Sequence, residues 1–362
     1  MLLSLPFLAI SFFFISVVGS FFVTSFFQKI AKHFHIWDDP KSNPLRKKQH
    51  APIPLLGGTG PAFVAIFFMS LLWLLNKYNP EFTAQFGINL EPFRLYWVLV
   101  AILILIIGGF LDDKLNIRPH WQVIPITAAL LVTIFLGEVR IEALSYPFNS
   151  LLPHTPFLPE IITFIWLGFC IAATKFLDGH DGLVTTVGIV SMLTIGSVSL
   201  FSHVNQPLIF LFTVVWLGVF AGFLPFNFPN AKMYLGEGGS EIIGFVIGFL
   251  SILSGAKIAT AGTVIGWFII DLVLVWLLRI LDRRNPLTSG DRLHWHFRLV
   301  DLGLSKVRVL VITTLILLVT AHAGLLFGTQ EKLWLIGSQI VWVSTIFIIT
   351  FSLSRFLPAR KK

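Results

Sequence analysis

Three sets of carboxylates in this chain are spaced in ways that suit metal or phosphate binding. Asp112 and Asp113 are adjacent at the end of an apolar segment, where their repulsion favours a shared proton or a bound cation. Asp178 and Asp181 are three residues apart at the start of a further segment, so a helix there would place both on one face. Glu237 stands among glycines in LGEGGS, which let a ligand approach the backbone, and a helix beginning there would offer free N–H groups to phosphate.

Basic residues and histidines in other loops could neutralise phosphate oxygens. They are Lys47, Lys48, Arg283, Arg284 and Arg292, with His294 and His296. Carboxylate oxygens in a chain with a single cysteine favour Mg²⁺, or Mn²⁺, over zinc. The reaction most compatible with these groups is metal-assisted phosphoryl transfer.

Each of these groups also has a purely structural explanation. The paired aspartates could cap a helix at the membrane surface, DGHDGL could be a turn with two helix caps, and LGEGGS could be a flexible connector. The basic residues could serve only to orient the chain in a membrane. Asp271 lies inside an apolar segment, where a carboxylate is costly and often functional, although a hydrogen bond to a neighbouring helix would also explain it. The functional interpretation is favoured because these groups lie in five unusual loops that all fall on one side of the membrane.

The composition indicates a membrane protein. Hydrophobic residues make up 56% of the 362 positions and charged residues 12%, against roughly 25% charged in soluble domains, and the mean hydropathy is +0.85. A crossing of the bilayer needs about 20 apolar residues, which predicts eleven transmembrane helices in a single domain over residues 1–362. The segments are 5–28, 55–75, 93–111, 119–137, 158–176, 183–201, 207–224, 240–255, 258–280, 307–327 and 333–354. The first lacks the basic start and cleavage site of a signal peptide, so we expect it to be retained.

The basic residues predict the orientation of these helices. With the N-terminus outside and the C-terminus cytoplasmic, all but five of the 26 Lys and Arg residues fall on the cytoplasmic side. The five exceptions are Lys77, Arg94, Arg140, Lys257 and Lys332. The expected fold is an all-α polytopic membrane protein whose active site is formed by five cytoplasmic loops. We attribute the net charge of +8 to this topology and expect no nucleic-acid partner.

The five loops together resemble those of the polyprenyl-phosphate N-acetylhexosamine-1-phosphate transferase family, of the glycosyltransferase family 4 type. The motifs, in chain order, are RKKQHAPIPLLGG, GGFLDD, FLDGHDGL, GFLPFN followed by YLGEGGS, and DRLHWH. The resemblance covers about residues 5–354. The PIPLLGG form is most similar to the branch that uses UDP-N-acetylglucosamine, which is related to the lipid I translocase.

The resemblance implies transfer of an N-acetylhexosamine 1-phosphate, in the first place GlcNAc-1-phosphate, from a UDP-sugar to undecaprenyl phosphate. UMP would be released and a lipid diphosphate sugar formed for a cell-envelope glycan. The expected cofactor is Mg²⁺, and the expected location is the plasma (inner) membrane with the site facing the cytoplasm. The resemblance assigns catalysis to Asp112, Asp113, Asp178 and His294, metal binding to Glu237 and Asp113, and substrate binding to Lys47, His50, Asp181, Asn227, Tyr234, Arg292 and His296. Among these, Asp112 is the residue expected to deprotonate the lipid phosphate.

Three departures from the family pattern concern the site itself. Glu237 stands where the family usually has Asp, Lys175 where it usually has Asn, and Phe297 where it usually has His. They leave open which sugar donor is used and how the metal is held. The alternatives are the phospho-MurNAc-pentapeptide transferase reaction of lipid I synthesis, a transporter or flippase, and an inactive scaffold. A homodimer is one option for assembly.

Overall fold

The computed structural model describes residues 4–40, 51–84, 92–142, 155–201, 204–254, 258–286 and 292–356, and the structural statements below concern these residues. Each of the eleven predicted apolar segments coincides with a helix. These helices are α1 (Leu5–His33), α2 (Thr59–Tyr78), α4 (Pro92–Leu115), α5 (Pro119–Leu131) with the π-helical turn η2 (Val132–Leu136), α6 (Leu158–Leu177), α7 (Leu183–Ser199), α8 (Pro207–Asn227), α9 (Glu237–Leu253), α10 (Ile258–Leu281), α12 (Lys306–Leu326) and α13 (Thr329–Phe356). Two short helices, α3 (Pro80–Ala84) and α11 (Trp295–Asp301), lie in connections.

The helices have the length and surface of membrane spans. Nine of those in the described part of the chain are long and apolar enough to cross a membrane, whereas α7 and α9 have only 17 residues each. Their outer faces expose large apolar side chains, such as Phe22 on α1 and Val341 on α13, which are 65% and 67% exposed. Such a surface suits lipid, because helices satisfy their own backbone hydrogen bonds. The chain is therefore a multi-pass α-helical membrane protein, as predicted. The count of eleven crossings and the orientation remain predictions.

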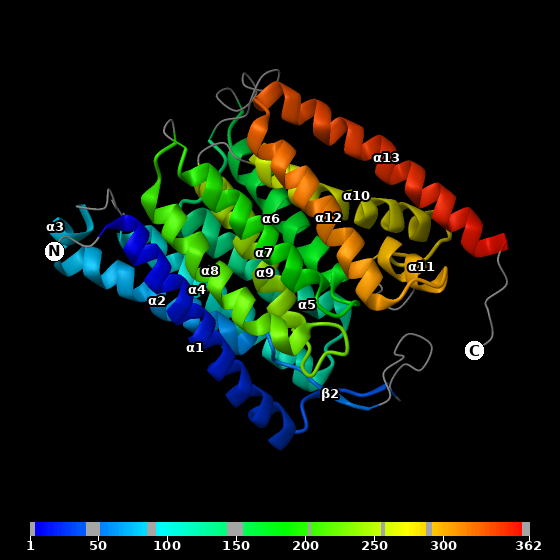
Figure 1. Ribbon diagram of the computed structural model, residues 1–362, viewed down its shortest axis with the longest axis horizontal. Helices are drawn as coiled ribbons and strands as arrows, with labels where there is room; N and C mark the ends of the chain where they lie inside the picture. The colour runs from blue at the N-terminus through cyan, green and yellow to red at the C-terminus, as the bar shows by residue number, and fades with distance from the viewer. Residues whose placement is uncertain are drawn as a thin grey trace.

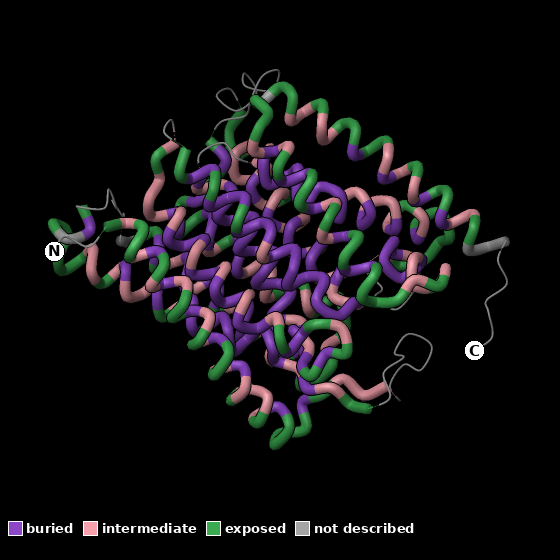
Figure 2. The backbone as a smooth tube through the Cα atoms, in the orientation of Figure 1, coloured by how far each residue is buried: buried purple, intermediate pink, exposed green. Residues whose placement is uncertain are grey.

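Helix α9 lies at the centre of the bundle (Figure 1, Figure 2). Fourteen of its 17 residues are buried, and it packs against α4, α6 and α7. Helices α1 and α2 pack on α8 at one flank, and α13 lies along α10 at the opposite edge. The candidate site forms around the start of α9, so the core fixes the helix ends that surround it.

Glycines allow the start of α9 to touch the backbones of its neighbours. A Cβ atom on Gly109 of α4 would overlap Gly238, and one on Gly58, directly before α2, would overlap Gly239. Small residues permit this kind of close approach between helices in membranes. The contact with α4 brings the last turn of that helix, which carries the paired aspartates, beside the first turn of α9.

A short strand pair, which the sequence analysis did not predict, completes the floor of the site. Strand β1 (Trp37–Asp38) pairs in antiparallel fashion with β2 (Ile53–Pro54). The backbone N–H of Tyr234 donates to the carbonyl of Pro54 at 2.9 Å, and the carbonyl of Tyr234 accepts from Gly57 at 2.9 Å. The segment before α9 is therefore hydrogen-bonded to β2 and to the residues that follow it, which holds the first loop against the fourth.

Candidate active site

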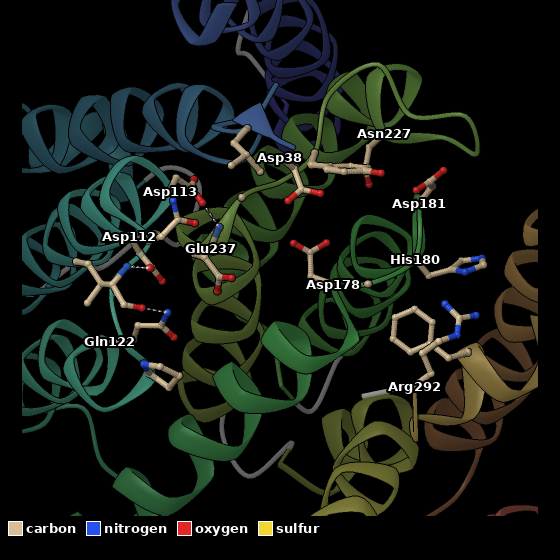
Figure 3. Close-up of a pocket in the computed structure, with 18 of the residues that line it drawn as sticks. Asp38, Asp112, Asp113, Gln122, Asp178, His180, Asp181, Asn227, Glu237 and Arg292 are labelled. Atoms are coloured by element: carbon tan, nitrogen blue, oxygen red, sulfur yellow. Dashed lines mark hydrogen bonds between the residues drawn. The ribbon is translucent and has the colours of Figure 1, made fainter. Parts of the chain in front are cut away.

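A cavity of about 400 Å³ lies at the end of the bundle where α9 begins, and all five predicted loops contribute to it (Figure 3). Its lining includes Asp38, Leu55, Asp112, Asp113, Asn116, Ile117, Pro119, Gln122, Asp178, Gly179, His180, Asp181, Asn227, Tyr234, Gly236, Glu237, Arg292, Phe297, Val300 and Lys306. Asp112, Asp113 and Glu237 lie at one end of the cavity, the acidic end, around the ends of α4 and α9. His180 and Arg292 lie at the other end.

The paired aspartates are held by backbone hydrogen bonds. Asp112 Oδ1 accepts from the N–H of Ile117 at 2.9 Å, in the turn that follows α4. Asp113 Oδ1 accepts from the N–H of Glu237 at 2.9 Å, across the contact between α4 and α9. The Oδ2 atoms of both aspartates are buried and have no hydrogen-bond partner among the described residues. Each carboxylate is thus oriented by one oxygen, while its other oxygen makes no hydrogen bond.

The glycine before Glu237 makes the second contact possible. Gly236 has φ +76° and ψ 168°, a conformation that residues with a Cβ atom rarely adopt. A Cβ atom there would also overlap Asp113 Oδ2. The glycines of LGEGGS therefore serve close packing around the carboxylates, and the interpretation as a flexible connector does not describe them.

Lys175, at the end of α6, lies among three carboxylates. Its Nζ is 2.6 Å from Glu241 Oε1, 2.8 Å from Glu237 Oε2 and 4.0 Å from Asp112 Oδ2. Glu241 belongs to the buried part of α9, whereas the Glu237 side chain is 42% exposed and lines the cavity. The departure noted at position 175 therefore places a cation directly behind the acidic wall of the cavity.

Asp178 and Asp38 lie between the two ends of the cavity, with their carboxylates turned towards its centre (Figure 3). Asp178 caps the C-terminus of α6, and Asp38 comes from strand β1. Tyr234 lies close to both. Burial, together with the charges of Asp181, Asp38 and Asp178, raises the pKa of the Tyr234 phenol well above its usual range. The phenol is therefore a neutral group that can donate a hydrogen bond or stack on a ring.

Asp181 organises the loop between α8 and α9. Its Oδ2 accepts from the backbone N–H groups of Asn230 and Ala231, at 3.1 and 3.4 Å, and from Lys306 Nζ at 2.9 Å. Asn227 acts on the same loop from α8. Its Oδ1 accepts from the N–H of Gly182 at 3.1 Å and from Thr185 Oγ1 at 2.8 Å, while Nδ2 donates to the carbonyl of Met233 at 3.2 Å. Both residues line the cavity, but these oxygen and nitrogen atoms are bonded to the loops and helix ends that form its walls.

The basic end is formed by His180, Arg292 and Lys306. Arg292 makes a double hydrogen bond to Asp301, with Nη2 at 2.8 Å from Oδ1 and Nε at 3.0 Å from Oδ2, and its guanidinium lies 4.7 Å from the ring of Phe297. His180 Nε2 is 2.9 Å from the carbonyl of Lys306. Burial lowers the pKa of His180 below its ordinary value, which favours a neutral ring that donates to this carbonyl.

His294 and His296 lie behind the cavity wall. Nδ1 of His294 is 2.8 Å from Asp271 Oδ2, and the N–H of Trp295 donates to Asp271 Oδ1 at 3.2 Å. Arg298 Nη2 is 3.5 Å from the same Oδ1. Burial lowers the pKa of Arg298 to about 10, although Asp271 opposes the shift. Asp271 thus anchors the start of α11 to α10 and fixes the orientation of His294. This agrees with the structural explanation considered above, a hydrogen bond from the intramembrane carboxylate to a neighbouring helix.

The structure brings together eight of the twelve predicted site residues around the cavity: Asp112, Asp113, Asp178, Asp181, Asn227, Tyr234, Glu237 and Arg292. His294 and His296 are buried and do not line it. Lys47 and His50 lie outside the described residues. Among the lining residues that were not predicted as site residues are Asp38, Gln122, His180 and Lys306. The double aspartate before the first motif was a usable signal for Asp38, whereas Lys306 had been counted only for orientation.

The acidic end fits a divalent cation. The Oδ2 atoms of Asp112 and Asp113, which make no hydrogen bond, and the carboxylate of Glu237 are hard oxygen donors of the kind that Mg²⁺ prefers. Within the described ranges, no three His, Cys, Asp or Glu side chains are grouped closely enough to hold a metal by themselves. Mg²⁺ commonly keeps water and substrate phosphates as ligands beside one or two carboxylates, so a partial set is sufficient.

The fold and the cavity define a polytopic membrane protein with a charged cavity at one end of its helix bundle. Comparison with known proteins names the family more closely. Residues 95–255 match the model of glycosyl transferase family 4. The chain is 26% identical to the probable undecaprenyl-phosphate N-acetylglucosaminyl 1-phosphate transferase of Bacillus subtilis, over 93% of this chain and 87% of the relative.

Two further relatives agree with this match. The chain is 27% identical to the undecaprenyl-phosphate alpha-N-acetylglucosaminyl 1-phosphate transferase of Escherichia coli, over 83% of this chain and 79% of the relative. It is 25% identical to the protein of the same name from Thermotoga maritima, over 89% and 91%. The family predicted from the five loop motifs is therefore confirmed.

Proposed function

We propose that this chain transfers GlcNAc-1-phosphate from UDP-N-acetylglucosamine to undecaprenyl phosphate. The observation that carries the proposal is the convergence of all five motif loops on one cavity with an acidic and a basic end. The named function of the relatives supplies the substrates, since two of the three described above are called undecaprenyl-phosphate alpha-N-acetylglucosaminyl 1-phosphate transferases.

In this reaction, an oxygen of the lipid phosphate attacks the phosphorus that carries the sugar. The bond from this phosphorus to the bridging oxygen of the diphosphate breaks, and UMP leaves with that oxygen. The lipid then carries a diphosphate linked to N-acetylglucosamine. In-line attack at phosphorus depends mainly on positioning and charge neutralisation, and the cavity provides carboxylates and cations within one space.

The residues have separate roles in this proposal. Asp112 accepts the proton of the lipid phosphate where one is present, through the oxygen that has no hydrogen bond. Asp113 and Glu237 hold Mg²⁺, which neutralises phosphate oxygens when it is bound. Arg292 and Lys306 face the diphosphate from the other end, and Tyr234 offers a neutral aromatic surface for the uracil ring. The N-terminus of α9 opens towards the cavity, where helix N–H groups favour phosphate.

A donor panel tests the reaction. Purified protein would be incubated with undecaprenyl phosphate, Mg²⁺ and, separately, UDP-N-acetylglucosamine, UDP-N-acetylgalactosamine or UDP-MurNAc-pentapeptide. We expect UMP release with the first donor and a matching lipid product on thin-layer chromatography. Release only with UDP-MurNAc-pentapeptide would support the lipid I reaction instead. The absence of UMP with every donor would refute the proposal and favour a scaffold.

We also propose that the cavity faces the cytoplasm of a plasma membrane. The excess of Lys and Arg on the side of the five loops supports this orientation. Cys170 is buried and is the single cysteine, so a new cysteine can be labelled selectively. Cysteine at Asn230, in the loop between α8 and α9, should be labelled by an impermeant maleimide in inverted vesicles and protected in intact cells. The reverse pattern would invert the orientation.

A further inference from the structure

A cation of the chain itself lies directly behind the acidic end of the cavity. Lys175 Nζ lies 2.6 Å from Glu241 Oε1, 2.8 Å from Glu237 Oε2 and 4.0 Å from Asp112 Oδ2. Its side chain is only 17% exposed and does not line the cavity. It therefore acts on the cavity through the two carboxylates that do, Asp112 and Glu237.

Glu241 keeps this lysine in place. It lies one helical turn beyond Glu237 in α9, and its side chain is only 3% exposed. A buried carboxylate is costly unless it is paired, so the contact with Lys175 is a requirement of the fold. Glu237 is different, because its side chain is 42% exposed and can leave the lysine without being buried alone. Glu241 is thus the permanent partner of Lys175, and Glu237 is the exchangeable one.

The same exchangeable carboxylate is the one proposed to hold Mg²⁺. An ammonium group and a divalent cation that share Glu237 repel each other, and this repulsion is strong where water is largely excluded. Phosphate oxygens brought by a substrate would offset the excess positive charge. The lysine should therefore weaken cation binding more in the free site than in the site that contains substrate.

We propose that Lys175, anchored by Glu241, is a positioning residue that competes with the divalent cation for Glu237, so that the cation binds weakly until a phosphate-bearing substrate is present. This inference rests on the proposed function, since it assumes the same cation site. It also gives Glu241 a role, because a buried ammonium group at position 175 needs a buried carboxylate, and Glu241 supplies it.

The test measures Mn²⁺ binding to the purified protein by electron paramagnetic resonance, without any UDP-sugar or lipid phosphate. The matched pair is Glu241→Gln and the double variant Lys175→Asn/Glu241→Gln. Neither variant leaves a charged carboxylate at position 241, so both avoid an unpaired buried charge, and thermal unfolding in detergent checks that both are folded. We expect the double variant to bind Mn²⁺ at least about tenfold more tightly than Glu241→Gln, because the competing ammonium is gone.

Two further measurements sharpen the result. Lys175→Arg keeps the charge and should bind Mn²⁺ within about threefold of the unmodified chain. Adding UDP should tighten Mn²⁺ binding more in the unmodified chain than in the double variant. Equal Mn²⁺ affinity in the matched pair, weaker binding in the double variant, or no Mn²⁺ binding by any of the proteins would overturn the inference. These outcomes do not depend on UMP release, so they are distinct from failure of the proposed function.

Discussion

The two ends of the cavity differ in how their charged groups are satisfied. At the acidic end, Asp112 and Asp113 each keep an Oδ2 without a hydrogen bond. At the basic end, Arg292 is bound by Asp301 and Lys306 by Asp181, each at less than 3 Å. At the acidic end, only Glu237 must release an internal partner, Lys175, to a ligand, whereas at the basic end both Arg292 and Lys306 must do so.

This difference separates two contributions to a transfer reaction. Groups that are already oriented and unsatisfied contribute to the chemical step, because little reorganisation is needed when charge develops. Groups that first release an internal partner lose part of their binding energy and contribute mainly to substrate affinity. We therefore expect substitutions at the acidic end to act on kcat and those at the basic end on KM.

The largest effect is expected from Asp113→Asn. Asparagine can still accept the hydrogen bond from the N–H of Glu237, so the contact between α4 and α9 is kept. It lacks the charge that the metal site uses, and kcat for UMP release should fall by about 10²–10⁴-fold. Asp301→Asn, at the basic end, serves as the control and should lower kcat by less than about threefold. Retention of more than a tenth of kcat by Asp113→Asn would contradict the assignment of the acidic end.

A smaller loss is expected at Glu237, where two substitutions can be compared. Glu237→Gln removes the charge but not the length of the side chain, and kcat should fall by roughly 10–100-fold. Glu237→Asp keeps a hard oxygen ligand and should retain kcat within about threefold, with a changed Mg²⁺ concentration for half-maximal rate. The measurement is UMP release against Mg²⁺ concentration. Equal losses in both variants would show that length, rather than charge, matters at this position.

At the basic end, Arg292→Ala should raise KM for the UDP-sugar by about tenfold, equivalent to about 1.4 kcal/mol, with kcat within about threefold. Asp301→Asn releases Arg292 from its double hydrogen bond and should leave KM unchanged or lower it. The pair thus separates binding by Arg292 from its structural role. A rise in KM in both variants would show that the contact with Asp301 holds the loop and that Arg292 does not meet the substrate.

The fold was largely predictable because its signal is local. Long apolar runs mark each of the eleven long helices, and the carboxylates stand where some of these runs end. Helices α4, α6 and α9, with their terminal aspartates and glutamate, therefore followed from the sequence. The pairing of β1 with β2 did not follow, since two residues per strand carry no alternating pattern. The close approach of the loops also depends on glycines whose partners are distant in the chain, such as Gly109 and Gly238.

The site was predictable at its acidic end and less so elsewhere. His294 and His296 match a motif, but a motif does not say which face of a seven-residue helix meets the cavity. In the structure, Phe297 takes the wall position, and its ring packs against Gly179. The pairing of Lys175 with Glu241 spans 66 residues. A glutamate inside an apolar helix was a sign that a cationic partner existed, although the sequence did not indicate which one.

The smallest effect concerns pH and tests whether the basic end is closed by internal contacts. Burial lowers the pKa of His180 below 6.5, its ordinary value, so the folded protein favours the neutral ring. As the pH falls, the unfolded chain takes up this proton first. The stability that His180 contributes is therefore complete above pH 6.5 and is lost as the pH falls from there through the folded-state pKa.

The measurement is Tm in detergent between pH 7.5 and 5.5 for the unmodified chain and for His180→Gln. Glutamine can donate to the carbonyl of Lys306 in place of the ring but does not titrate. We expect the unmodified chain to lose more Tm on acidification than the variant does, while the two are similar at pH 7.5. Parallel curves would mean that protonated His180 is tolerated beside Lys306 and Arg292. The basic end would then be open enough to admit a further charge, and its contrast with the acidic end would be weaker than the contacts indicate.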